Sequence, residues 1–128
     1  DDKERPTLFE GFLEALGAKP VDFPYKTECC GSFQSVGSPD VATECARKIL
    51  ESAVKSGAEV IVSTCPMCTF NIDHKQMDIK AKYLHFREVP VLYFTQLLGI
   101  TLGLEPKALG FELNFVDPLP LLKDRALL

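Results

Sequence analysis

The chain has 128 residues, of which 46% are hydrophobic, and it carries a formal net charge of −4. This length suits a single domain over residues 1–128 with a core of its own, and the lack of lysine and arginine clusters argues against nucleic acid as a partner. No apolar run approaches the roughly 20 residues of a membrane span, and no secretory leader is recognisable, so we expect a cytoplasmic domain without direct membrane insertion.

The first expected elements are a helix, a strand and a loop. Apolar residues recur at helical spacing over residues 8–16, and Gly17 is a suitable C-terminal cap. Residues 21–25 alternate between apolar side chains and polar or proline ones, which predicts a short edge strand. Residues 27–37 show no clear period, so we expect a loop that contains the first two cysteines.

A helix, a strand and a second helix follow. Ser38 is a suitable N-cap, a proline comes directly after it, and apolar positions keep to one helical face until Gly57. Residues 59–63 form a β-branched apolar run, which is typical of a strand covered on both faces. The next helix is predicted over residues 66–75, with Cys65 at or next to its N-cap.

The last predicted elements are a strand over residues 90–93, a helix over 95–102 and an irregular tail over 104–128. This order predicts an α/β fold: a small parallel-sheet βαβ domain with helices on both faces and an irregular C-terminal tail. In such sheets reactive groups gather beyond the carboxyl ends of the strands. Both groups of cysteines are predicted to lie there.

Four of the five cysteines form two close groups, namely Cys29, Cys30, Cys65 and Cys68. The odd number of cysteines argues against a secreted disulfide framework, and in a reducing compartment clustered cysteines are more often metal ligands or redox groups. A Cys-x-x-Cys pair at a helix N-terminus gains thiolate character from the free N–H groups there. Since metals bind thiolates, these four residues are the candidate ligands.

The adjacent cysteines favour an iron–sulfur cluster over zinc. Finger-type zinc sites usually space their ligands by two to four residues, so that the chain can turn between them. A cluster offers several irons, so neighbouring thiolates can bind different metal atoms. Gly31 relaxes the backbone directly after the pair. Zinc stays open as an alternative metal.

The cysteine pattern resembles a known family, the CCG cysteine-rich domain found in the B subunit of heterodisulfide reductases. The resemblance rests on Cys29-Cys30-Gly31, on Cys65-Pro66-Met67-Cys68 and on the strand residues 60–62. It is supported by residues 94–99, by Gly-Leu-Glu-Pro at 103–106 and by Asp117-Pro118. The cysteine motif is its specific part.

The resemblance implies a noncubane [4Fe-4S] cluster held by Cys29, Cys30, Cys65 and Cys68, with the cluster itself as the catalytic centre. It further implies cleavage or formation of a disulfide between two small thiols by stepwise one-electron transfer. The implied partners are the iron–sulfur and flavin subunits of a heterodisulfide reductase-like complex. The same domain type occurs in complexes that oxidise lactate, glycolate or sulfur, so the substrate does not follow from the resemblance.

The family motif has a further cysteine upstream of the doublet, and none of the residues before Cys29 is a cysteine. The chain also begins at Asp1 rather than Met. We therefore expect a fragment of a longer chain that starts after this ligand, or else a domain that binds its cluster with fewer cysteines.

Three other functions are compatible with the same residues. They are a zinc-stabilised subunit-docking module without catalysis, a thioredoxin-like dithiol at Cys65 and Cys68, and an electron-transfer domain of a lactate or glycolate oxidase-type complex. For the remaining candidates we prefer structural roles. Cys45 is expected as a small core residue rather than a ligand. Surface or structural positions are expected for the candidate proton donors His74 and His85, core positions for the candidate cleft residues Phe33 and Tyr93, and solvated positions for Lys26, Lys48 and Lys75 rather than a role in attracting acidic substrates.

Overall fold

The computed structural model describes residues 1–128 as five α-helices, three 3-10 helices and two strands. In chain order these are α1 (Leu8–Ala15), η1 (Ser32–Gln34), α2 (Pro39–Lys55), β1 (Ile61–Ser63), α3 (Pro66–Lys82), β2 (Val91–Tyr93), α4 (Phe94–Thr101), η2 (Pro106–Leu109), η3 (Phe111–Leu113) and α5 (Leu119–Asp124). None of the helices combines the length and the apolar composition that crossing a bilayer requires.

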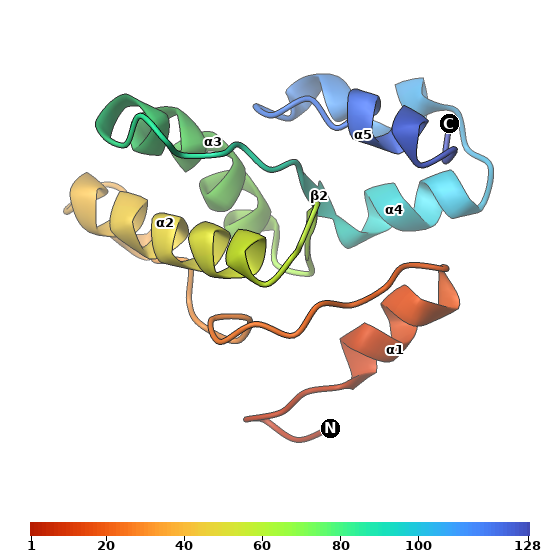
Figure 1. Cartoon of the computed structure of the whole chain (residues 1–128), viewed down its shortest axis with the longest axis horizontal. Helices are drawn as coiled ribbons and strands as arrows, with labels where there is room; N and C mark the ends of the chain where they lie inside the picture. Colours follow the sequence, from red (N-terminus) through yellow and green to blue (C-terminus); the bar gives the residue numbers. More distant parts are fainter.

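The two strands form a parallel sheet, in which Ile61 pairs with Val91 and Ser63 pairs with Tyr93. Helix α3 connects them, so β1, α3 and β2 make one βαβ unit (Figure 1). This arrangement confirms the predicted α/β fold with a parallel sheet. The sheet has only these two short strands.

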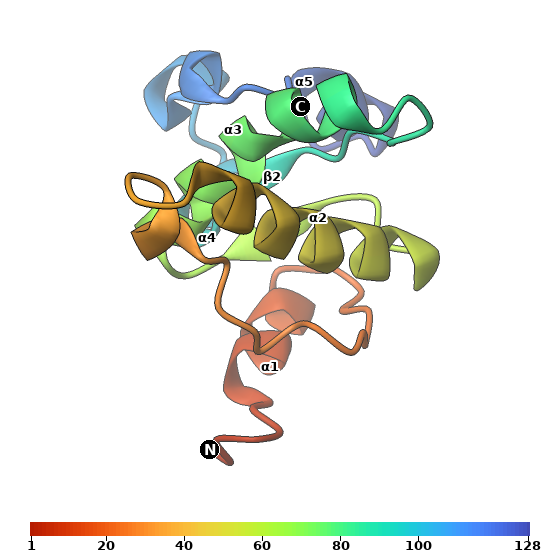
Figure 2. The same ribbon diagram turned by 90° about the vertical axis from the view of Figure 1, so that its left-hand side faces the viewer.

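Helices cover both faces of the sheet, as predicted. Ile61 and Val91 point into a core shared with α2 and α3. Their neighbours Val62 and Leu92 point the other way, into a second core with α4, η3 and α5, because successive strand residues face opposite sides. Helix α1 adds partly buried leucines to this second core and lies on the opposite side of α4 from α5 (Figure 2).

Helix α3 is longer than predicted and ends at Lys82 rather than near residue 75. Its buried face contains Asn71, Asp73 and Gln76 besides two isoleucines, so its sequence lacks a clear apolar period. The buried polar groups are all hydrogen-bonded. Gln76 receives a hydrogen bond from the Val89 N–H at 2.9 Å and donates one to the Val89 carbonyl at 2.8 Å.

The predicted strand over residues 21–25 was wrong. This segment runs as coil and turns, with a hydrogen bond from the Lys26 N–H to the Phe23 carbonyl at 3.3 Å. Two prolines within six residues, Pro20 and Pro24, lack the N–H groups that a sheet ladder needs. Cys29 and Cys30 therefore follow a turn and not a strand.

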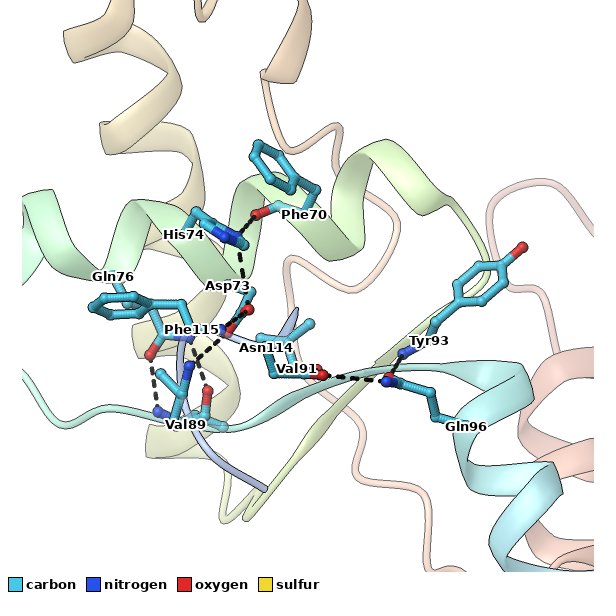
Figure 3. A network of polar contacts seen from close by, with 11 residues as sticks. Phe70, Asp73, His74, Gln76, Val89, Val91, Tyr93, Gln96, Asn114 and Phe115 are labelled. Carbon is cyan, nitrogen blue, oxygen red and sulfur yellow. Dashed lines mark hydrogen bonds and ion pairs between the residues drawn. The ribbon is translucent and has the colours of Figure 1, made fainter. Parts of the chain in front are cut away.

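The tail after residue 104 contains no strand and only the short helices η2, η3 and α5. Polar contacts fasten it to the βαβ unit, as Figure 3 shows. The buried Asp73 carboxylate accepts hydrogen bonds from the N–H groups of Phe115, at 2.6 Å, and Val116, at 3.1 Å. Asn114 donates to the Val91 carbonyl at 2.7 Å. The tail thus closes over the sheet through specific bonds although its sequence has no regular pattern.

A close contact joins the loop after the cysteine doublet to helix α2. Gly31 has a φ of 76°, in the left-handed region that favours glycine. A Cβ atom placed on Gly31 would lie 3.0 Å from both the Cβ and the Sγ of Cys45. The space beside the glycine is therefore already filled by the Cys45 side chain.

Replacement of Gly31 by alanine should destabilise the protein by about 1–3 kcal/mol, because it adds backbone strain and overpacks the contact with Cys45. Urea unfolding of the two proteins measures the difference. Gly37→Ala is the matched control, since Gly37 lies in the same loop, lacks a left-handed φ and has nothing within 4 Å of its Cβ position. That variant should change stability by less than about 0.5 kcal/mol; equal losses in both would contradict the prediction.

Candidate metal centre

The doublet joins an exposed cysteine to a buried one. Cys29 is open to solvent, whereas Cys30 is only 1% exposed and belongs to the core between α2 and α3. The Gly31 N–H donates to the Cys29 Sγ at 3.5 Å, and the left-handed turn at Gly31 leads directly into η1. The two neighbouring thiols therefore face different surroundings.

The second pair lies where β1 passes into α3. Cys65 is the N-cap of α3, as predicted, and Pro66 is the first helical residue. The Cys65 N–H donates to the Ser63 hydroxyl at 3.2 Å, and the Cys65 carbonyl accepts from the Thr69 N–H at 2.9 Å. Cys68 lies in the first turn and is half-buried, while Cys65 is exposed.

The two thiols of this pair differ in acidity. The backbone N–H of Cys68 holds the pKa of Cys65 below its ordinary value, with further contributions from the Cys68 thiol and the Met67 N–H. Burial raises the pKa of Cys68 to about 12, and the neighbouring thiols of Cys30 and Cys65 add to this effect. Of the two, Cys65 is therefore the more easily ionised thiol, and a bound cation would favour ionisation of Cys68.

Three of the four predicted ligands lie near one another. The thiols of Cys30 and Cys65 both contribute to the raised pKa of Cys68, and Cys68 packs against the core that contains Cys30. Cys29 stands at the exposed edge of this group, next to Cys30. The doublet and the Cys-x-x-Cys pair, far apart in the sequence, therefore lie together beyond the carboxyl end of β1.

The donor set suits a polynuclear cluster. No three Cys, His, Asp or Glu side chains converge on a position for a single metal ion. In an iron–sulfur cluster the thiolates bind different irons and need not point at one atom. Four sulfur donors at the edge of a core, with one at a helix N-terminus, have the chemistry that such a cluster requires.

Asn71 is a residue of this site that sequence reasoning missed. Its side chain is 3% exposed, and its Nδ2 donates to the Cys30 carbonyl at 3.0 Å. Its Oδ1 accepts a hydrogen bond from the Ser35 hydroxyl at 3.2 Å. The one signal in the sequence is an amide one helical turn after Cys68, at a position that an apolar residue would otherwise fill.

Cys45 is half-buried on α2 and packs against Gly31, beside the doublet rather than deep in the core. His74 stacks on Phe70 with 4.1 Å between ring centroids, and its Nδ1 is 3.1 Å from the Phe70 carbonyl. His85 is exposed on the loop after α3.

The other candidates lie at the surface or serve the fold. Phe33 is 75% exposed on η1, and Tyr93 is the N-cap of α4. Lys26 pairs with Glu10 and Asp22, Lys75 pairs with Asp78, and Lys48 is exposed.

Several known proteins are similar in sequence to this chain. The chain is 38% identical over 118 residues to the B subunit of the ferredoxin:CoB-CoM heterodisulfide reductase of Methanosarcina mazei, and the match covers 91% of this chain and 39% of that protein. It is 36% identical over 116 residues to the B subunit of the ferredoxin/F(420)H(2)-dependent CoB-CoM heterodisulfide reductase of Methanosarcina acetivorans, covering 89% of this chain and 39% of that protein.

A third relative has a different name. The chain is 36% identical over 112 residues to the 8-methylmenaquinol:fumarate reductase membrane anchor subunit of Wolinella succinogenes, covering 88% of this chain and 39% of that protein. The chain thus spans about two fifths of the length of each of these relatives. The model of the family CCG, described as a cysteine-rich domain, matches residues 2–73, which is more than half of the chain and includes both cysteine pairs. The chain therefore belongs to the CCG cysteine-rich domain family.

Proposed function

We propose that this chain is the iron–sulfur domain of a heterodisulfide reductase-like catalytic subunit, with a cluster bound by Cys29, Cys30, Cys65 and Cys68. The observation that carries the proposal is that Cys68 packs against the core that contains Cys30, near enough for the Cys30 thiol to raise the pKa of Cys68, although the two residues are distant in the sequence. The two relatives that are B subunits of heterodisulfide reductases support it.

The four cysteines would hold the cluster from two sides. When bound, a noncubane [4Fe-4S] cluster supplies one-electron transfer and iron sites for sulfur. The buried Cys30 and half-buried Cys68 would anchor it on the protein side, where the core excludes water. Cys65 has a pKa below its ordinary value, which favours the thiolate form that a metal binds. Cys65 and Cys29 are both exposed, so the outer side of the site would stay open to solvent.

The proposed reaction is the cleavage of a disulfide between two small thiols. Two electrons and two protons convert R–S–S–R′ into RSH and R′SH, and the reverse reaction forms the disulfide. Iron–sulfur and flavin subunits of a cytoplasmic complex would deliver the electrons singly. Phe33, Met67 and Phe70 expose apolar surface on η1 and on the first turns of α3, where the carbon chains of such thiols can pack.

A second candidate is an electron-transfer domain that does not act on a disulfide. The Wolinella succinogenes relative favours it, because the name of that protein refers to a quinol and fumarate and to no disulfide. An assay of the assembled complex with reduced viologen and a panel of small disulfides distinguishes the two functions. Stoichiometric release of two thiols supports the reductase, whereas a cluster that no disulfide reoxidises supports the second candidate.

The full-length protein purified without oxygen should be brown and contain roughly four irons and four acid-labile sulfides per cluster of this type. Iron, sulfide and zinc analyses together with the visible spectrum measure this. About one zinc per chain without iron would instead indicate the zinc-stabilised docking module, and it would overturn the cluster assignment.

Cys68→Ser should remove most of the bound iron, because the serine hydroxyl is a poor replacement for a buried thiolate ligand. Cys45→Ser is the matched control, since Cys45 is also a half-buried cysteine near the doublet but lies outside the proposed ligand set. Iron per chain should stay near the wild-type value in that variant. Equal iron loss in the two variants would show that the ligand set is wrong.

A further inference from the structure

We propose that Asn71 is a positioning residue that holds Cys30 near Cys68. It thereby fixes the position of the cysteine doublet relative to the Cys-x-x-Cys pair. This inference deepens the proposed function, because the role of the two cysteines as ligands rests on that proposal. The positioning itself rests on contacts within the polypeptide, and it can be tested without iron.

The doublet has little regular structure to hold it. Residues 29–31 belong to no helix or strand, so ladder hydrogen bonds do not fix them. Asn71 supplies a fixed point from α3, since its Nδ2 donates to the Cys30 carbonyl at 3.0 Å in a buried bond. It lies one helical turn after Cys68 on the same rigid helix. Fixing the Cys30 carbonyl relative to Asn71 therefore fixes it relative to the Cys68 thiol.

A second hydrogen bond orients the Asn71 amide. The Ser35 hydroxyl donates to Oδ1 at 3.2 Å, while the Cys30 carbonyl can only accept, so the NH2 group must face the doublet. Ser35 directly follows η1. The buried Asn71 amide thus makes hydrogen bonds to the chain before and after the left-handed turn at Gly31.

A second buried amide on α3, that of Gln76, provides the control. Gln76 is fully buried and ties Val89 to the helix through two hydrogen bonds, at 2.8 and 2.9 Å (Figure 3). It matches Asn71 in burial, chemistry and host helix but holds the approach to β2 rather than the cysteines. Loss of either amide should lower stability, and only loss of Asn71 should separate the thiols.

The experiment measures how readily Cys30 and Cys68 form a disulfide. The full-length protein, iron-free and with Cys29 and Cys65 replaced by serine, is equilibrated in glutathione buffers, and the linked peptide is quantified by mass spectrometry. Asn71→Ala should lower the effective concentration of the two thiols by about tenfold or more, the size expected for a lost buried hydrogen bond. Gln76→Ala should change it by less than about threefold, although its melting temperature falls.

Equal changes in the two variants, or no change in Asn71→Ala, would overturn the proposal. If Asn71→Ala fails to fold, Ser35→Ala decides, because it removes only the bond that orients the amide. A fall of about threefold supports the positioning role, and an unchanged equilibrium overturns it. An iron-free natural protein would refute the proposed function and leave this measurement intact.

Discussion

Helix α3 packs against α2 on one side and against the two strands on the other, and this packing decides where the cysteines lie. The helix begins at the Cys-x-x-Cys pair, so its placement over the sheet brings Cys65 and Cys68 to the carboxyl end of β1. The segment with Cys30 is then enclosed between α2 and α3. Two buried amides on the same helix bind neighbouring segments: Asn71 donates to the Cys30 carbonyl, and Gln76 donates to the Val89 carbonyl shortly before β2. The candidate centre therefore depends on one element more than on any single residue.

The four candidate cysteines differ in their exposure to solvent. One thiol is buried, one is half-buried and two are exposed, and the exposed one at the helix N-terminus has a lowered pKa. A site with uniform burial would shield a bound group fully, and one with uniform exposure would bind it weakly. The gradient observed here gives a protected inner side and an accessible outer side, which suits a centre that holds a group and also meets a small substrate.

The sequence predicted most of the fold because local signals agreed with tertiary packing. Proline at the first helical position and glycine shortly after the last one predicted α2, and a β-branched apolar run predicted β1. The failures have physical causes. The expected strand at 21–25 is broken by Pro24. Helix α3 extends beyond its predicted end, which was placed too early because the buried face of the helix contains Asp73 and Gln76, which a hydrophobic pattern treats as surface residues. The spacing of the cysteines identified both pairs. It did not identify Asn71, because a single buried amide produces no repeating pattern in the sequence.

The contact between Gly31 and Cys45 also bears on how this domain changes through evolution. The side chain of Cys45 fills the space that any other residue at position 31 would need. A larger residue at position 45 would press on the backbone directly after the doublet. Because the left-handed φ of Gly31 strains any other residue whatever the space around it, lineages that keep the turn should keep glycine at position 31 and a small residue at position 45.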